Sequence, residues 1–177
     1  MGDYSAERYD PKLSMCGNKA VVTLHFNGTT LTMLSSGKMF SYPAVSGRPG
    51  AAGGFDYSVD NQKQKNKGPI PEGTYWIRPD ELQENSWSRV FNPTSAWGNF
   101  WISIHPFTTT ETYGRGGFFI HGGDVPGSAG CVDLTSHMDQ FVKDLKAELA
   151  GVATCQIHLT VEYPKIGDYP KPKYTYA

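Results

Sequence analysis

Short apolar runs separated by turn residues fill the first quarter of the chain. AVVTLHF at 20–26 is rich in β-branched residues, and the Asn-Gly pair that follows it is typical of tight hairpins. A second run lies at 31–34, and a Ser-Gly pair at 36–37 leads into a third, KMFSYPAV, at 38–45. The pattern predicts three strands joined by short turns, a β-meander.

The same mixture of apolar and polar positions returns later in the chain. Strands are predicted at 73–79, 99–104, 117–120 and 156–162, where aromatic and aliphatic residues mix with polar ones. The segment 46–71 differs, because it is rich in glycine, proline and polar residues. We expect a long loop there, of the kind that is functional or mobile in a compact domain.

One helix stands out between the last two predicted strands. Ser136 is its predicted N-cap, with Asp139 three residues later as in a capping box, and Gly151 ends it. The apolar residues at helical spacing are Met138, Phe141, Val142, Leu145 and Leu149. The sequence therefore predicts a mostly β fold with one main α-helix, in a single domain covering 1–177 with a surface tail at 164–177.

Composition narrows the class of protein. The 177 residues carry a formal net charge of −1, which argues against nucleic acid or an anionic membrane as the main partner. No stretch is apolar and long enough to span a bilayer, and residues 1–13 lack the basic start and apolar run of a secretory signal. We therefore expect synthesis in the cytoplasm without a cleaved leader.

The three cysteines leave two interpretations open. In one, Cys16 and Cys155 form a disulfide and Cys131 stays free. In the other, which synthesis in the cytoplasm favours, all three are reduced thiols and two of them are buried as small apolar residues.

The stretch GGFFIHGGDVPGSAGCVDL, at 116–134, places a histidine and a cysteine on either side of a glycine-rich loop. A cysteine reacts as its thiolate, and a neighbouring imidazole can take the thiol proton to form a nucleophilic ion pair. Glycine permits the sharp return that would bring His121 and Cys131 to one end of a sheet. Peptide N–H groups of 127–131 could then point at a developing oxyanion.

Other interpretations of this loop stay open. It can be a glycine-rich turn with a buried cysteine. A zinc site from His121, Cys131 and His137 lacks the CxxC or HxxxH spacing of strong metal motifs. The charged neighbours can orient the histidine, hold substrate or be solvated loop charges; they are Arg115, Asp124 and Asp133.

The order of residues in this loop resembles the active-site signature of L,D-transpeptidases of the YkuD-type fold. The matching residues are HGG at 121–123 and SAGCV at 128–132. YPAVSG at 42–47 and GPIPEGTY at 68–75 are similar to the strand-and-turn elements that precede the site in that family, so the likeness covers roughly 21–134. SGRPG, KGPIPEGTYWI and GRGGFFIHGGDVPGSAGC are also similar to the type VI secretion L,D-transpeptidase effectors, toxins delivered into rival bacteria.

The resemblance implies a fold and a chemistry. The fold is a YkuD-like β-sandwich. The substrate is the stem peptide of peptidoglycan, which an L,D-carboxypeptidase or L,D-transpeptidase opens between its third and fourth residues, releasing D-alanine or exchanging it, without a cofactor. Cys131 would be the nucleophile and His121 its general base, oriented by a carbonyl of Gly122 or Gly123.

The resemblance also extends to the residues around this pair. Ser128 and Gly130 belong to the expected oxyanion loop. Ala129 replaces the second histidine of cell-wall-building members, and Asp133 replaces the arginine or asparagine common there, so these two positions affect how substrate is held. The expected substrate contacts are Arg48, Arg115 and Asp124; a guanidinium binds a carboxylate through two hydrogen bonds.

Partners and location follow from the same resemblance. An effector of this kind would be injected by the type VI secretion machinery and would act in the periplasm of the target cell. In the producing cell, a cognate immunity protein would cover its cleft.

Two other functions compete with this one. The first is an NlpC/P60-like cysteine amidase of peptidoglycan, although that class sets its cysteine at a helix start with the histidine later in the chain. The second is a non-catalytic wall-binding module, in which exposed Trp87, Trp97 and Trp101 would stack on sugars instead of packing in the core, as large aromatic residues usually do.

Overall fold

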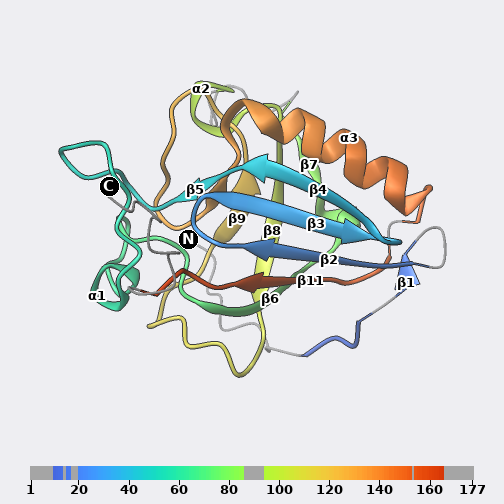
Figure 1. Ribbon diagram of the computed structural model, residues 1–177, viewed down its shortest axis with the longest axis horizontal. Coiled ribbons are helices and arrows are strands. Elements are labelled where there is room, and N and C mark those ends of the chain that lie inside the picture. Colours follow the sequence, from blue (N-terminus) through green and yellow to red (C-terminus); the bar gives the residue numbers. More distant parts are fainter. Residues whose placement is uncertain (1–9, 14, 17–19, 86–93, 153, 166–177) are drawn as a thin grey trace, which may run out of the picture.

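The structure of the chain is a computed structural model that describes residues 10–13, 15–16, 20–85, 94–152 and 154–165. In Figure 1, strands β2, β3 and β4 run across the view, β8 and β9 cross behind them, and helix α3 lies along one side. The strands are β1 (Met15–Cys16), β2 (Ala20–Phe26), β3 (Thr30–Ser35), β4 (Lys38–Pro43), β5 (Val45–Ser46), β6 (Gly73–Ile77), β7 (Gln83–Glu84), β8 (Phe100–Pro106), β9 (Phe118–His121), β10 (Val132–Asp133) and β11 (Ile157–Val161). The helical segments are α1 (Val59–Gln62), η1 (Pro79–Glu81), α2 (Thr94–Trp97), η2 (Thr135–His137) and α3 (Met138–Leu149).

The strands are joined in the order β4-β3-β2-β11-β6-β8-β9-β10-β5. β2, β3 and β4 are paired antiparallel, which confirms the predicted meander, whereas β11 runs parallel to β2 and β10 parallel to β9. The predicted strand at 38–45 is divided in two. The N–H of Ala44 turns to the carbonyl of Thr29 at 3.0 Å, and β5 pairs with β10 instead of β3. One apolar run thus links the meander to the strand that follows the cysteine loop.

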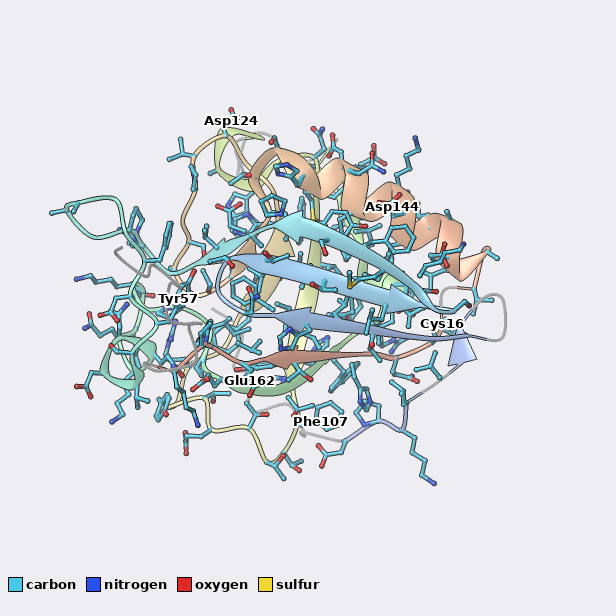
Figure 2. The ribbon with its side chains drawn as sticks, in the orientation of Figure 1. Cys16, Tyr57, Phe107, Asp124, Asp144 and Glu162 are labelled. Atoms are coloured by element: carbon cyan, nitrogen blue, oxygen red, sulfur yellow. A yellow bond between two sulfur atoms is a disulfide. The ribbon has the colours of Figure 1, made fainter. Side chains whose placement is uncertain are left out.

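Alternate side chains along the strands fill a common core. Leu24 of β2 and Ile120 of β9 both belong to it and are at most 2% exposed. Helix α3 closes one side, where the ring of Phe141 lies 5.4 Å from that of Tyr42 and the Tyr42 hydroxyl donates to Asp144 at 2.8 Å. Figure 2 shows Asp144 on this helix beside the strands. The mostly β architecture with one main helix after the cysteine loop is therefore confirmed.

Helix α3 buries all five predicted apolar positions, but it begins differently from the prediction. Ser136 lies in the 3-10 turn η2, and the N-cap is His137, which makes no side-chain cap hydrogen bond. Asp139 accepts a hydrogen bond from Asn99 at 2.9 Å instead of closing a capping box. The predicted N-cap was wrong because the chain enters the helix through a turn that is already helical, so no extended capping residue precedes it.

The long loop at 46–71 is anchored at its two ends and near its middle. Ser46 Oγ accepts a hydrogen bond from the Ile70 N–H at 2.8 Å, and the Tyr57 hydroxyl donates to a backbone carbonyl in the β2–β3 turn. Residues 49–54, at the tip, are exposed. Movement of this loop stays a prediction, and these contacts restrict it to the tip. Most of the predicted surface tail lies outside the described residues.

Cys16 and Cys155 form a disulfide, and Cys131 is free. The bonded pair is separated by 139 residues in sequence, with Cα atoms 5.5 Å apart. β1 pairs with β2, and Cys155 leads into β11, which also pairs with β2, so both cysteines reach the end of the sheet where Figure 2 labels Cys16. The expectation of three reduced thiols is therefore wrong, because the spacing of cysteines does not reveal which strands are neighbours.

Candidate active site

Two parallel strands carry the predicted nucleophile and its base to the same face of the sheet. β10 pairs with β9 so that Asp133 lies beside His121 and Val132 beside Ile120. Ile120 and Val132 are fully buried in the core, so alternation along each strand puts His121 and Asp133 on the opposite face. Cys131 precedes Asp133 by two residues and shares that face. The backbone N–H of Phe119, on β9, donates a hydrogen bond to its sulfur.

The imidazole of His121 is fixed in one tautomer. Its Nδ1 lies 2.6 Å from the carbonyl oxygen of Gly122. A carbonyl accepts hydrogen bonds and cannot donate, so Nδ1 carries the hydrogen and Nε2 is left as the basic nitrogen. The ring of Trp97 covers the imidazole at a centroid distance of 5.0 Å. The carbonyl that the sequence placed in the Gly122–Gly123 segment is therefore that of Gly122.

Burial favours the protonated form of the Cys131 sulfur. The residue is 8% exposed, and its burial raises the thiol pKa to about 12. The Phe119 N–H and the Arg115 guanidinium act in the opposite direction, whereas the negative charge of Asp133 raises the pKa further. Burial therefore disfavours the preformed thiolate–imidazolium pair that the sequence suggested, and residue spacing gives no measure of that burial.

Asp133 is a buried member of this site and not a solvated loop charge, as one interpretation of the sequence had it. It is 1% exposed, and its two carboxylate oxygens accept hydrogen bonds from the N–H groups of Thr135 at 2.8 Å and Gly127 at 2.9 Å. Its Oδ1 lies 4.0 Å from Nδ1 of His121. Burial raises the pKa of Asp133, and the charge of His121 and the two N–H donors oppose that rise.

Two of the backbone N–H groups at 127–131, in the cysteine loop, already donate hydrogen bonds within the protein. The Gly127 N–H is taken by Asp133, and the Ser128 N–H donates to the carbonyl of Gly47 at 2.9 Å. The Ser128 hydroxyl donates to the Cys131 carbonyl at 2.7 Å. The predicted oxyanion donors are thereby reduced to the N–H groups of 129–131.

Gly130 is a position in the loop that has no room for a side chain. It adopts φ 116°, and an added Cβ would lie 2.5 Å from a terminal nitrogen of Arg115. Larger residues are excluded next to the nucleophile for this reason.

Arg115 is buried and bound to the backbone. Its two terminal nitrogens donate to the carbonyls of Gln62, Gly68 at 2.8 Å, Pro69 at 2.6 Å and Ala129 at 3.5 Å. Both nitrogens that would grip a substrate carboxylate are therefore engaged, so its contacts give no support to the substrate role expected for Arg115.

The other two expected substrate contacts are exposed. Arg48 lies at the start of the long loop, and Asp124 lies at the far edge of the cysteine loop, where Figure 2 labels it. Asp124 lines a pocket of about 230 Å³ together with Gly123 and the start of α3. In the described part of the chain, no hydrogen bond or ion pair joins either residue to Cys131. Their roles in substrate binding stay predictions.

Residues 48–155, more than half of the chain, match the Tlde1 domain. The chain belongs to the Tlde1 family of type VI L,D-transpeptidase effectors. The family match includes the histidine, the glycine loop and the cysteine whose geometry is described above. No curated protein sequence matches this Tlde1 chain.

Three solved structures are similar to the Tlde1 chain at low identity. Bd1075 of Bdellovibrio bacteriovorus has a TM-score of 0.49 and 18% identity over 80% of this chain and 47% of its own. An L,D-transpeptidase from Mycobacterium smegmatis has a TM-score of 0.42, 16% identity, and coverage of 81% and 59%. L,D-transpeptidase 1 of Mycobacterium tuberculosis has a TM-score of 0.42, 14% identity, and coverage of 81% and 62%. The Tlde1 chain thus spans less than two thirds of the length of each.

Two tryptophans of the Tlde1 chain lie beside the histidine and not in the core, where the sequence had placed them. Trp97 and Trp101 are half-buried, and their rings are 6.2 Å apart. Trp101 is the register partner of His121, and Trp97 also contacts Phe119 at 5.6 Å. Sequence could have indicated this face through the alternation along 99–104. Trp87 lies outside the described residues.

Metal ligation and membrane crossing find no support in the described part of the Tlde1 chain. Within it, no three His, Cys, Asp or Glu side chains are grouped to hold a metal ion. The zinc site of His121, Cys131 and His137, one interpretation of the sequence, is therefore not formed. No described helix combines the length and the apolar character required to cross a bilayer.

Proposed function

We propose that the protein is an antibacterial effector whose Cys131 cleaves peptidoglycan stem peptides between their third and fourth residues. D-alanine leaves, and the acyl group passes to water, as in an L,D-carboxypeptidase, or to a D-amino acid or another stem, as in an L,D-transpeptidase. The observation that carries the proposal is that His121 ends one strand of a parallel pair and Cys131 directly precedes the other, with Nδ1 of the histidine committed to a carbonyl. Membership in the Tlde1 family supports the substrate class.

The chemistry begins from a neutral thiol. Nε2 of His121 takes the proton of Cys131 while the sulfur forms a bond to the carbonyl carbon, and the carbonyl electron pair moves onto oxygen. N–H groups of 129–131 then stabilise the oxyanion. When the C=O bond re-forms, the C–N bond breaks and the imidazolium gives its proton to the departing amine of D-alanine. The thioester that remains is opened by water or by an amine, with His121 again acting as base.

Because the thiol pKa is raised, the reaction depends on His121 as the base. A sulfur that is protonated at neutral pH cannot attack by itself, so transfer of its proton to His121 has to accompany bond formation. The carbonyl of Gly122 supports this role by holding the hydrogen of the neutral ring on Nδ1, so that Nε2 carries the lone pair, and by keeping the ring in place.

Location and partners are part of the proposal. We expect synthesis in the cytoplasm, injection by the type VI secretion machinery, action in the periplasm of the target cell, and an immunity protein that protects the producer. The support for these expectations is family membership.

The half-exposed aromatic face beside His121 favours one second candidate, a wall-binding module. Trp97 and Trp101 offer ring surface on which sugars can stack. Such a module would bind muropeptides equally well after alkylation of Cys131 and would show no turnover.

The test is incubation of the protein with purified tetrapeptide muropeptides, with and without an added D-amino acid, followed by mass analysis. We expect tripeptide products, and exchanged products when the amino acid is present. Cys131→Ala and His121→Ala should each abolish both, whereas His25→Ala, a change of a part-exposed histidine on β2, should retain them. Near wild-type conversion by either site variant would contradict the assigned roles, and release of a longer peptide would favour an amidase.

A further inference from the structure

We propose that Asp133 is a positioning residue that couples removal of the thiol proton to attack by the sulfur: its carboxylate disfavours a free thiolate on Cys131 and stabilises the imidazolium that His121 becomes. The inference rests on the proposed function and adds a third side chain to the pair. It goes beyond orienting the ring, a task that the Gly122 carbonyl already performs.

The position of Asp133 is fixed from three directions. It is the register partner of His121, with Oδ1 4.0 Å from Nδ1, a separation suited to charge attraction and too long for a hydrogen bond. The N–H groups of Thr135 and Gly127 bind one oxygen each. Two donors to one buried carboxyl group favour its ionised form. The negative charge of the carboxylate therefore acts on its neighbours from a fixed position. Water and salt screen this charge poorly, because the residue is 1% exposed.

Three charged or titratable groups of neighbouring segments face this carboxylate or the sulfur. His121 comes from β9, Cys131 from the residue before β10, and Arg115 from the preceding loop. Asp133 and Arg115 act on the thiolate in opposite directions, and burial adds to the effect of Asp133. A sulfur in these surroundings carries little free negative charge.

The same charge has the opposite effect on the histidine. As the S–C bond forms, the S–H electron pair enters that bond and the proton moves to Nε2, so the negative charge appears on the carbonyl oxygen and not on sulfur. The imidazolium then stands beside the Asp133 carboxylate, with no thiolate nearby to be repelled. Asp133 therefore opposes ionisation of the sulfur without substrate and favours proton transfer with substrate present.

A purely structural role is the competing explanation, since Asp133 also joins Gly127 of the loop to Thr135 of η2. The two explanations differ in what a change that keeps the charge does. Loosening of the loop would expose the sulfur and speed its alkylation in any Asp133 variant, Asp133→Glu included, and would lower the temperature of unfolding. Loss of charge should make the sulfur easier to ionise, and the histidine a weaker base, only in the uncharged variants.

The experiment compares Asp133→Asn with Asp133→Glu, which keeps the charge, and with Glu162→Gln, which removes a carboxylate whose side chain is 72% exposed. Asp133→Ser is the second uncharged variant, because a hydroxyl oxygen can still accept from a backbone N–H whereas an amide NH2 cannot. Alkylation of Cys131 by iodoacetamide is followed above about pH 8, beyond the range in which imidazole titrates. Muropeptide turnover and thermal unfolding are measured in parallel.

We expect Asp133→Asn and Asp133→Ser to be alkylated several-fold faster at a given pH, with the rising limb moved to lower pH, while kcat falls at least tenfold and KM changes little. Asp133→Glu should stay close to the wild-type alkylation rate, and Glu162→Gln should match the wild type in both assays. Slower or unchanged alkylation in the folded uncharged variants, or equally fast alkylation of Asp133→Glu, would overturn the inference. The alkylation arm needs no substrate, so it decides the role of Asp133 even if the wild type fails to convert muropeptides and the proposed function is wrong.

Discussion

Nη1 of Arg115 donates a hydrogen bond to the carbonyl oxygen of Pro69 at 2.6 Å, which joins the end of the long loop to the segment before β9. The other terminal nitrogen bonds Gly68 and, at 3.5 Å, the carbonyl of Ala129 in the cysteine loop. One buried cation thus binds two loops that are far apart in sequence, one of which carries the nucleophile.

Replacement of this side chain should be costly to the fold. We expect Arg115→Met to lower the free energy of unfolding by about 3 kcal/mol, since it leaves several buried carbonyls without a donor. Urea unfolding measures the change, and Arg48→Met, in an exposed arginine, should stay within about 0.5 kcal/mol of the wild type. An equally small change for Arg115→Met would show that the carbonyls find other partners.

Trp97 should influence the rate through the histidine that it covers. Its ring, 5.0 Å from the imidazole, attracts the imidazolium more than the neutral ring. We expect Trp97→Leu to lower kcat about fivefold, corresponding to about 1 kcal/mol, with less effect on KM.

Steady-state kinetics on muropeptides checks this prediction. Trp97→Phe is the matched control, because it keeps an aromatic face and should retain most of the rate. A rise in KM without a fall in kcat would instead place the ring in substrate binding, as the wall-binding alternative requires.

The disulfide should be the largest single covalent contribution to stability. It joins residues 139 positions apart in sequence, for which restriction of the unfolded chain predicts about 5 kcal/mol. We expect the double variant Cys16→Ala/Cys155→Ala to melt well below the oxidised wild type and at the same temperature with or without reductant. Mass analysis of alkylated, non-reduced protein should find one reactive thiol, at Cys131; three would contradict the bond.

Glu148 should make stability depend on pH. Its carboxylate accepts hydrogen bonds from Lys38 at 3.0 Å and Ser35 at 2.9 Å, and these contacts, that of Lys38 first, lower the pKa of Glu148. A carboxyl whose pKa is lowered on folding stabilises the fold above its unfolded pKa, and this contribution is lost as the pH falls through the folded value.

We therefore expect Glu148→Gln to cost on the order of 1 kcal/mol at neutral pH and progressively less below about pH 4. Urea unfolding over a series of pH values tests this. Glu162→Gln changes a side chain that is 72% exposed and should leave the curve unaltered at all of them. A difference that stays constant with pH would assign the effect of Glu148 to packing.

The sequence was most informative where structure repeats over a few residues. The meander, the apolar face of α3 and the strand before His121 were predicted because side-chain direction has a period of two in strands and 3.6 in helices. The boundaries were less accurate, as at Ser136, because a 3-10 turn before the helix leaves no pattern of its own.

The active site, like the fold, has features that local sequence predicts and features that it does not. The amino-acid sequence by itself determined which residues are chemically able to react, and the glycines between His121 and Cys131 permitted their return to one strand pair. Only the tertiary structure decided the burial of the thiol and of Asp133, the backbone role of Arg115 and the pairing of Cys16 with Cys155. Each of these depends on burial or on neighbours from distant segments, and local residue patterns contain neither.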